Sequence, residues 1–305
     1  MMPRALNEIH ELCGRGTLVS YMGGEPTTSR HLTDWIEQAG RLGLDFRFTT
    51  NGYIMNEDMA RRFVAAGLFN IGISIESLDP RINETIRPFP GGTARTLQCI
   101  TLLLQERKRQ KKHTSLNIKT VLTDINLESF IEIARRFGKM EGVMCTPQIF
   151  EPLDAMPGPT KELLCIKDNQ RLQRVTDQIR ALKREGCAIH ITEQALNDMV
   201  KQNLEDQGHT STMHHKNLEK DASEPPCNIG TDNLWIEHGK VKLCPYFDPI
   251  GDFTRNPRPT LKKMWKSEIT RQVRAQTRAC RRLCTISCLR RTPLSHKIST
   301  FLKIA

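Results

Sequence analysis

"VSYMGGEPTTS", residues 19–29, places two adjacent glycines, a glutamate and a proline directly after an apolar, β-branched run. The apolar run predicts a short buried strand, and the polar segment predicts a helix with Ser29 as its N-cap. Glycine lets the backbone adopt conformations closed to other residues and lets a ligand approach the main chain closely. The carbonyl groups here and Glu25 offer acceptors to a cationic group, although a Gly-Gly turn before a helix is also a common structural feature.

Strands and helices alternate regularly from the N-terminus to about residue 150. Strands are predicted at residues 17–22, 45–50, 69–76, 115–122 and 142–150, and helices at 3–13, 29–43, 56–67, 93–108 and 126–138. This alternation predicts a parallel α/β sheet, either doubly wound or part of a barrel. In such sheets the chemistry lies at the carboxyl ends of the strands. The informative residues are therefore 23–26, 50–52, 74–77 and 123.

Length and composition bound the class of protein. The 305 residues suffice for one large domain or for a domain with a smaller appendage. No apolar run is long enough to cross a membrane, and a charged N-terminal segment argues against a secretory signal, so a cytoplasmic location is expected. The net charge of +11 favours acidic partners. Few aromatic residues lie among the basic ones, which argues against nucleic acid.

The strand ends, taken together, resemble those of radical S-adenosylmethionine (radical SAM) enzymes. The resemblance runs from about residue 5 to 150 through "GGEP", "TTNG", "SIES", "IRPFPGGTARTLQCITLL" and "IKTVLTDINLESF". It implies a partial (βα)6 TIM-like barrel. It also implies a SAM site made of Gly23, Gly24, Glu25, Pro26, Ser74 and Arg95.

The resemblance gives each of these residues a role. The glycines and Glu25 would lie against the methionine ammonium of SAM, and Ser74 would reach the ribose or neighbouring atoms. Arg95 would pair with the SAM carboxylate, since a guanidinium can clamp a carboxylate with two hydrogen bonds. Thr50 and Asn51 are expected to shape their turn rather than to touch the ligand.

The defining loop of this family, Cys-x3-Cys-x2-Cys, is absent from the 305 residues. In the family its three thiolates hold a [4Fe–4S] cluster that reduces SAM and yields a 5′-deoxyadenosyl radical. Truncation at the N-terminus is the favoured explanation, and it would also remove the first barrel strand and leave an unpaired sheet edge. A degenerate relative without radical chemistry is the alternative. The radical SAM cluster is therefore expected only if the missing segment is present.

Cysteines gather toward the C-terminus. After a helical connector and polar linker (151–226), the segment 227–305 is predicted as a small cysteine-rich α+β domain with a hairpin that turns at Gly239. It resembles the SPASM or twitch appendage of some radical SAM enzymes, which implies an auxiliary [4Fe–4S] cluster. The favoured ligands are Cys227, Cys244, Cys284 and Cys288, with Cys280 as the alternate. The Cys-x3-Cys-x3-Cys spacing departs from the appendage's usual pattern, and a zinc site of four thiolates is the competing interpretation.

The function predicted from these features is that of a radical SAM enzyme. It would abstract hydrogen from a peptide, protein or small-molecule substrate and would receive electrons from a donor such as flavodoxin or ferredoxin. The alternative is a non-catalytic module whose metal-stabilised tail binds a partner. The substrate itself is not encoded in these motifs.

Overall fold

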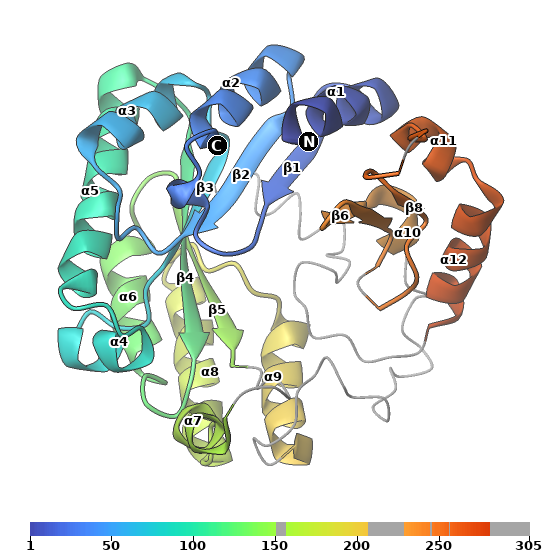
Figure 1. Ribbon diagram of the computed structural model, residues 1–305. Coiled ribbons are helices and arrows are strands. Elements are labelled where there is room, and N and C mark those ends of the chain that lie inside the picture. Colours follow the sequence, from blue (N-terminus) through green and yellow to red (C-terminus); the bar gives the residue numbers. More distant parts are fainter. Residues whose placement is uncertain (151–156, 207–228, 245, 256, 281–305) are drawn as a thin grey trace. The chain divides into compact units, whose positions relative to one another are not determined.

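The computed structural model describes residues 1–150, 157–206, 229–244, 246–255 and 257–280 (Figure 1). The chain forms two compact units. The described residues between 15 and 206 form the sheet unit, and those at 1–14 and between 229 and 280 form the C-terminal unit. The domain limits predicted at residues 150 and 226 stay predictions.

The sheet unit contains five parallel strands that follow one another in chain order. They are β1 (Leu18–Tyr21), β2 (Asp45–Thr50), β3 (Asn70–Ser74), β4 (Ser115–Leu122) and β5 (Val143–Ile149). Each strand pairs in parallel with the next. All five predicted strands and their parallel arrangement are therefore confirmed.

Helices connect the strands of this sheet. They are the 3-10 helix η1 (Pro26–Thr28), α2 (Leu32–Leu42), α3 (Glu57–Ala65), α4 (Pro80–Ile86), α5 (Gly92–Gln110) and α6 (Ser129–Phe137), followed by α7 (Gly158–Leu164), α8 (Asn169–Arg184) and α9 (Glu193–Asp206). Asn56 caps α3 as predicted, because its side chain accepts a hydrogen bond from the Met59 amide at 2.9 Å. The prediction that Ser29 caps α2 is wrong. Ser29 ends η1, and α2 begins after His31, which makes no side-chain cap.

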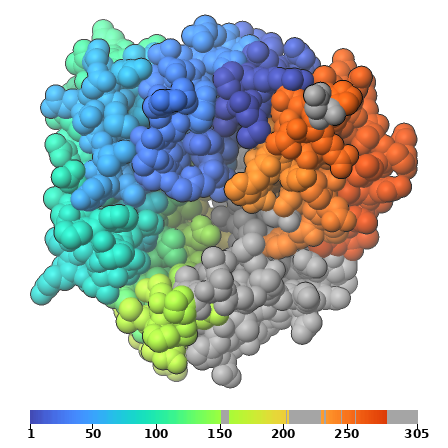
Figure 2. All heavy atoms as spheres, viewed as in Figure 1, coloured from blue at the N-terminus to red at the C-terminus, as the bar shows by residue number. Residues whose placement is uncertain are grey.

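The apolar core lies between the sheet and these helices. Along β2, the buried Phe46 and Phe48 alternate with half-buried Arg47 and Thr49. Phe48 meets Phe63 of α3 edge-to-face, with 5.4 Å between the ring centroids. Figure 2 shows the atoms of α2, α3 and α5 as a closely packed blue-to-teal layer. The half-buried polar side chains, such as Arg47 and Thr49, lie on the opposite face of the sheet, which is called the inner face below.

The C-terminal unit contains a small antiparallel sheet. Its elements are α1 (Met2–Cys13), α10 (Ile229–Asp232), β6 (Trp235–Glu237), β7 (Lys240–Lys242), β8 (Gly251–Asp252), α11 (Leu261–Trp265) and α12 (Glu268–Ala279). The predicted hairpin is confirmed: β6 and β7 pair antiparallel around His238 and Gly239, which both have positive φ. The third strand, β8, was not predicted from the sequence.

Helix α1 packs inside the C-terminal unit although it lies at the other end of the chain. Ala5 belongs to the same buried cluster as Val241 and Met264. The buried Glu8 accepts hydrogen bonds from the Leu261 amide at 2.7 Å and from Arg258 at 3.3 Å. Glu8 therefore fastens α1 to the first turn of α11. Within the described residues, none of the helices is both long and apolar enough to span a bilayer.

Candidate functional site

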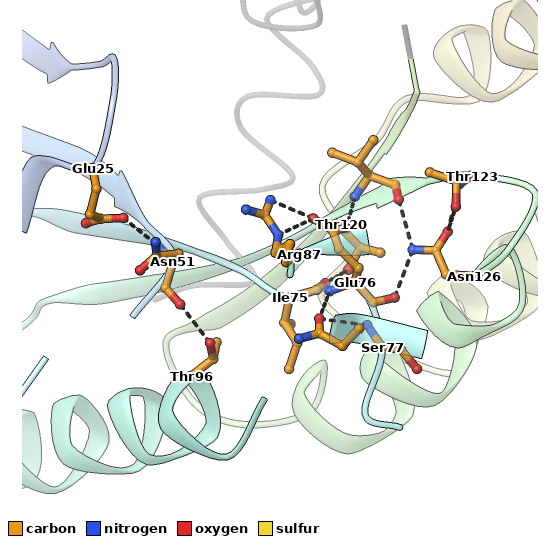
Figure 3. A network of polar contacts seen from close by, with 12 residues as sticks. Glu25, Asn51, Ile75, Glu76, Ser77, Arg87, Thr96, Thr120, Thr123 and Asn126 are labelled. Atoms are coloured by element: carbon orange, nitrogen blue, oxygen red, sulfur yellow. Dashed lines mark hydrogen bonds and ion pairs between the residues drawn. The ribbon is translucent and has the colours of Figure 1, made fainter. Parts of the chain in front are cut away.

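The loops after β1, β2, β3 and β4 meet at the carboxyl edge of the sheet, as the strand pattern predicted (Figure 3). Two carboxylates tie these loops together. Glu25 follows β1 and contacts the end of β2, and Glu76 follows β3 and contacts β4. This edge is the candidate functional site.

Glu25 accepts four hydrogen bonds from its own chain. Its Oε1 atom accepts hydrogen bonds from the amide and the hydroxyl of Thr27, at 3.1 and 2.5 Å, and from the hydroxyl of Thr50, at 2.6 Å. Its Oε2 atom receives the Asn51 amide at 2.8 Å. The carboxylate therefore caps η1 and joins the first loop to the second. The predicted contact of Glu25 with a ligand ammonium stays a prediction.

Gly23 and Gly24 both need the conformational freedom of glycine. Their φ angles are 103° and 53°, in the left-handed region that other residues avoid. A Cβ built on either residue would meet no atom within 4 Å. The two glycines thus present bare backbone to open space, as a close ligand approach requires.

The "TTNG" turn is held by hydrogen bonds between its own residues. The Gly52 amide donates to the Thr50 hydroxyl at 3.0 Å, and the Tyr53 amide donates to Asn51 Oδ1 at 2.8 Å. Gly52 has φ 73°, and a Cβ there would lie 3.0 Å from the Cβ of the buried Cys99. Thr50 and Asn51 therefore shape the turn, as expected, and the expectation that they do not touch the ligand stays a prediction.

At the third strand end, Ser74 is the last residue of β3, and the buried Glu76 follows two residues later. Arg87 pairs with Glu76: its Nε and Nη2 atoms lie 2.8 and 2.6 Å from Glu76 Oε1. The Val121 amide of β4 donates to Glu76 Oε2 at 2.7 Å. The side chain of Glu76 is 1% exposed and that of Arg87 is 31% exposed. The carboxylate of the pair is therefore buried, and the arginine extends from it to the protein surface.

Burial sets the protonation behaviour of Glu76. Removal from water raises the pKa of this carboxyl above its ordinary value, and the Arg87 charge and the Val121 amide offset only part of that rise. A carboxyl with a raised folded-state pKa costs the folded chain free energy when it ionises. The pair therefore fixes geometry at this edge rather than adding net stability.

Two buried asparagines complete the edge. Asn83 of α4 accepts a hydrogen bond from the Glu76 amide at 2.8 Å, and its side-chain amide donates one to the Thr93 hydroxyl of α5 at 3.0 Å. Asn126 donates to the carbonyls of Glu76 and Val121, each at 2.9 Å, and accepts the Thr123 amide and hydroxyl, each at 2.7 Å. All hydrogen-bonding atoms of the Asn126 amide are thus engaged. Asn126 locks the loop after β4 onto the loop after β3 (Figure 3).

Arg95 is exposed on the first turn of α5 and leans over Tyr53. Its guanidinium carbon lies 4.7 Å from the centroid of the Tyr53 ring, and Nη1 lies 3.4 Å from the Tyr53 carbonyl oxygen. Tyr53 also packs against Phe89, with 5.4 Å between centroids. A small recess beside these rings is lined by Asn51, Tyr53, Asn83, Arg87, Phe89, Gly92 and Thr96. The predicted pairing of Arg95 with a ligand carboxylate stays a prediction.

Glu84 of α4 fixes the start of α5. Its carboxylate accepts the Gly91 amide at 3.1 Å and the Thr93 amide at 3.3 Å. Desolvation raises the pKa of Glu84, but these hydrogen bonds outweigh it and hold the pKa below its usual value. A carboxylate at a helix N-terminus also complements the helix dipole. Glu84 therefore orients the turn that presents Arg95.

The cysteines predicted to bind metal are only partly described. Cys244 is buried after β7, and Cys280 follows the end of α12. Cys227, Cys284 and Cys288 lie outside the described residues. No group of three or more His, Cys, Asp or Glu side chains suited to a metal ion occurs in the part of the chain that the structure describes. The auxiliary-cluster ligands stay predictions.

The sequence interpretation overlooked Arg87, Asn83 and Asn126. Arg87 stands before a proline, where a helix is expected to end, and Asn126 stands in the "TDIN" segment after β4. Both lie in motifs quoted for the family resemblance, "IRPFPGGTARTLQCITLL" and "IKTVLTDINLESF". A search of those stretches for polar residues that could satisfy the buried loop amides would have found them.

Comparisons with known proteins agree on one family. Residues 3–137 match the family model described as the radical SAM superfamily. An AdoMet-dependent heme synthase from Methanosarcina barkeri is 27% identical over 119 residues, which are 38% of this chain and 32% of that protein. The matched segments span between 18% and 38% of the length of the curated relatives.

Among solved structures, native anSMEcpe with bound AdoMet and Cp18Cys peptide has a TM-score of 0.58 at 14% identity and covers 100% of this chain and 87% of that one. Streptococcus suis SuiB bound to the precursor peptide SuiA has a TM-score of 0.55 at 17% identity and covers 99% of this chain and 63% of that one. At these identities the likeness concerns the fold. Over residues 3–137 the chain is similar to the radical SAM superfamily.

Proposed function

We propose that the carboxyl edge of the five-stranded sheet binds SAM and that the chain acts on a peptide substrate as part of a radical SAM enzyme. The observation that carries the proposal is the convergence at one edge of bare glycine backbone, the "TTNG" turn and Ser74. The match of residues 3–137 to the radical SAM superfamily supports SAM as the ligand. Of the two similar solved structures, one contains AdoMet and the Cp18Cys peptide and the other the precursor peptide SuiA, which supports a peptide substrate.

The fold that we propose for the sheet unit is a partial (βα)6 barrel represented by five of its strands. In this arrangement the inner face of the sheet ends at its carboxyl edge, where the active sites of such barrels lie. The carbonyls of Gly23 and Gly24 would accept hydrogen bonds from the SAM ammonium, with Glu25 against the same group and Pro26 in the same loop. Ser74 would reach the ribose, and Arg95 would turn from Tyr53 to the carboxylate.

The SAM-cleaving cluster does not fit the residues of this chain. When bound, such a cluster supplies the electron that breaks a carbon–sulfur bond of SAM, and it needs three thiolates in a Cys-x3-Cys-x2-Cys loop. The 305 residues contain no such loop. Cys99, which lies near Glu25, is buried, and desolvation together with the Glu25 charge raises its pKa to about 12. We therefore assign binding and positioning to these residues and derive no electron-transfer step.

A second candidate is a module that binds SAM or a peptide without radical chemistry. The missing Cys-x3-Cys-x2-Cys loop favours it. Formation of 5′-deoxyadenosine from SAM under reducing conditions separates the two candidates, since only the enzyme produces it.

We extend the proposal to an auxiliary [4Fe–4S] cluster held by Cys227, Cys244, Cys284 and Cys288, with Cys280 as the alternate. Thiolates are the ligands that such clusters use, and the burial of Cys244 suits a cluster shielded from water. Anaerobic reconstitution is expected to give about four irons and four sulfides per chain. Zinc without acid-labile sulfide would contradict this assignment. A flavodoxin or ferredoxin would be a suitable electron donor, because the chain is strongly basic.

Arg95→Ala is expected to weaken SAM binding by about 1.5–3 kcal/mol, the usual contribution of a hydrogen bond to a charged group. The measurement is anaerobic calorimetry of SAM binding to the full chain. Arg109→Ala is the matched control, because Arg109 is exposed on the same helix about 21 Å farther along. Equal affinity of the Arg95 variant and the wild type, with the fold intact, would remove Arg95 from the site.

A further inference from the structure

The inner face of the sheet is polar, which is unusual for an all-parallel sheet. Such sheets are normally covered on both faces, and their strands are continuous apolar runs. Here β4 alternates strictly, with Asn117 and Lys119 on the half-buried face and Leu116 and Ile118 fully buried toward the helices. A sheet with this pattern faces water or a polar ligand on one side.

The register of the strands determines which inner-face residues lie side by side in a row across the sheet. Arg47 lies in one row, next to Asn70. The following row contains Thr49 and Gly72, and the row after that contains Ser74 and Lys119. Lys119 is therefore the direct neighbour of Ser74, at the end of the sheet where SAM is proposed to bind.

The side chain of Lys119 extends across β3, where Gly72 has no side chain that would obstruct it. Its Nζ atom donates to Thr49 Oγ1, two strands away, at 2.9 Å. The path runs over Gly72 of β3: a Cβ there would lie 2.6 Å from Thr49 Oγ1 and 3.0 Å from Lys119 Cε. Any other residue at position 72 would obstruct the lysine. The glycine and the threonine thus hold the ammonium over the centre of the inner face.

The charges of the inner face are unequal. In the strand positions described, Arg47 and Lys119 contribute positive charge and Asp45 contributes negative charge. Asp45 and Arg47 lie in the rows nearer the amino ends of the strands. Among these strand positions, the charged side chain in the row of Ser74 is therefore that of Lys119.

We propose that the inner face holds an oxyanion of the substrate, a carboxylate or a phosphate, and that Lys119 is a specificity-determining residue for it. This inference rests on the proposed function, because it takes the substrate to lie beside SAM at the same edge. Thr49 and Gly72 position the ammonium, and the anion would orient the substrate toward the SAM site.

The test is equilibrium dialysis of the full chain with two labelled probes at low ionic strength. Pyrophosphate represents a phosphate-bearing substrate, and glutarate represents the acidic side chain of a peptide. Lys119→Met is expected to weaken binding of the preferred probe at least tenfold, and Lys119→Arg is expected to retain it. Lys266→Met is the control, because Lys266 is an exposed lysine of the C-terminal unit. Lys119→Gln replaces the methionine variant if that variant does not fold.

Each outcome decides the inference. Probe binding that depends on Lys119 supports it, and the stronger probe identifies the source of the oxyanion. Absence of binding of either probe to the wild type overturns it, as does binding that Lys119→Met leaves unchanged. SAM affinity, measured by calorimetry on the same proteins, separates the two proposals. Loss of SAM binding in Lys119→Met with both probes unaffected would assign the lysine to SAM and overturn the inference. Failure of the wild type to bind SAM would overturn the proposed function alone.

Discussion

Replacing Arg87 by methionine is expected to lower the free energy of unfolding by about 3–5 kcal/mol, because it leaves a buried carboxylate without its counter-charge. Glu76 is 1% exposed, and among the described residues the Val121 amide is the partner that its carboxylate keeps in this variant. Methionine preserves much of the packing volume of the arginine stem. Urea unfolding monitored by circular dichroism measures the loss.

The loss in Arg87→Met should depend on pH in a defined direction. Burial already raises the pKa of Glu76, and removal of the Arg87 charge raises it further. An acid with a raised folded-state pKa imposes its cost only when ionised, so the loss is largest above the folded-state pKa that Glu76 has in the variant and shrinks as the pH falls through that pKa. The double variant Glu76→Gln/Arg87→Met, which removes both charges, is expected to recover most of the stability. A loss that is independent of pH and persists in the double variant would contradict this account.

Asn126→Leu is expected to cost about 3 kcal/mol or more. Leucine is close in size but leaves the carbonyls of Glu76 and Val121 and the Thr123 amide without a partner in a buried setting. Each buried polar group left unsatisfied costs about 1–3 kcal/mol. The same unfolding experiment measures the effect.

The control for Asn126→Leu is Asn197→Leu, because Asn197 is exposed on α9 and accepts a hydrogen bond from Arg180 at the surface. A change below about 1 kcal/mol is expected there. If Asn126→Leu is equally mild, the four hydrogen bonds of Asn126 do not hold the loops at this edge.

Both variants also bear on the site. Glu76 and Asn126 fix the backbone that leads from Ser74 into the next loops, so a change that releases them should also loosen the proposed SAM site. Stability and SAM affinity are thus expected to fall together in Arg87→Met. A distant variant such as Arg109→Ala should leave both unchanged.

Sequence reasoning located the strands because their periodicity reflects the two faces of the sheet. Residues 45–50 and 115–122 alternate between apolar and polar side chains, and both form strands within the predicted limits. The same alternation carried the information that Lys119 lies on the inner face. Its neighbours there, Thr49 and Gly72, are set by strand register, which the sequence does not state directly.

Other features depend on contacts between distant segments and could not be derived from local patterns. Helix α1 has an ordinary amphipathic sequence, and only the folded chain reveals that Glu8 joins it to Leu261. Glu25 was predicted as a ligand contact because it lies in "GGEP", but its four hydrogen bonds to Thr27, Thr50 and Asn51 reveal a structural role as well. Ser29 was expected to cap α2, but the chain forms the short helix η1 first.

The central claim is that SAM binds at the carboxyl edge of the five-stranded sheet. Hydrogen–deuterium exchange of the full chain, with and without saturating SAM under nitrogen, tests it most directly. The account predicts slower exchange in peptides that cover residues 22–28, 50–54 and 74–78, and unchanged exchange in peptides from residues 235–252. Unchanged exchange at all three strand ends, or protection confined to the C-terminal unit, would contradict it.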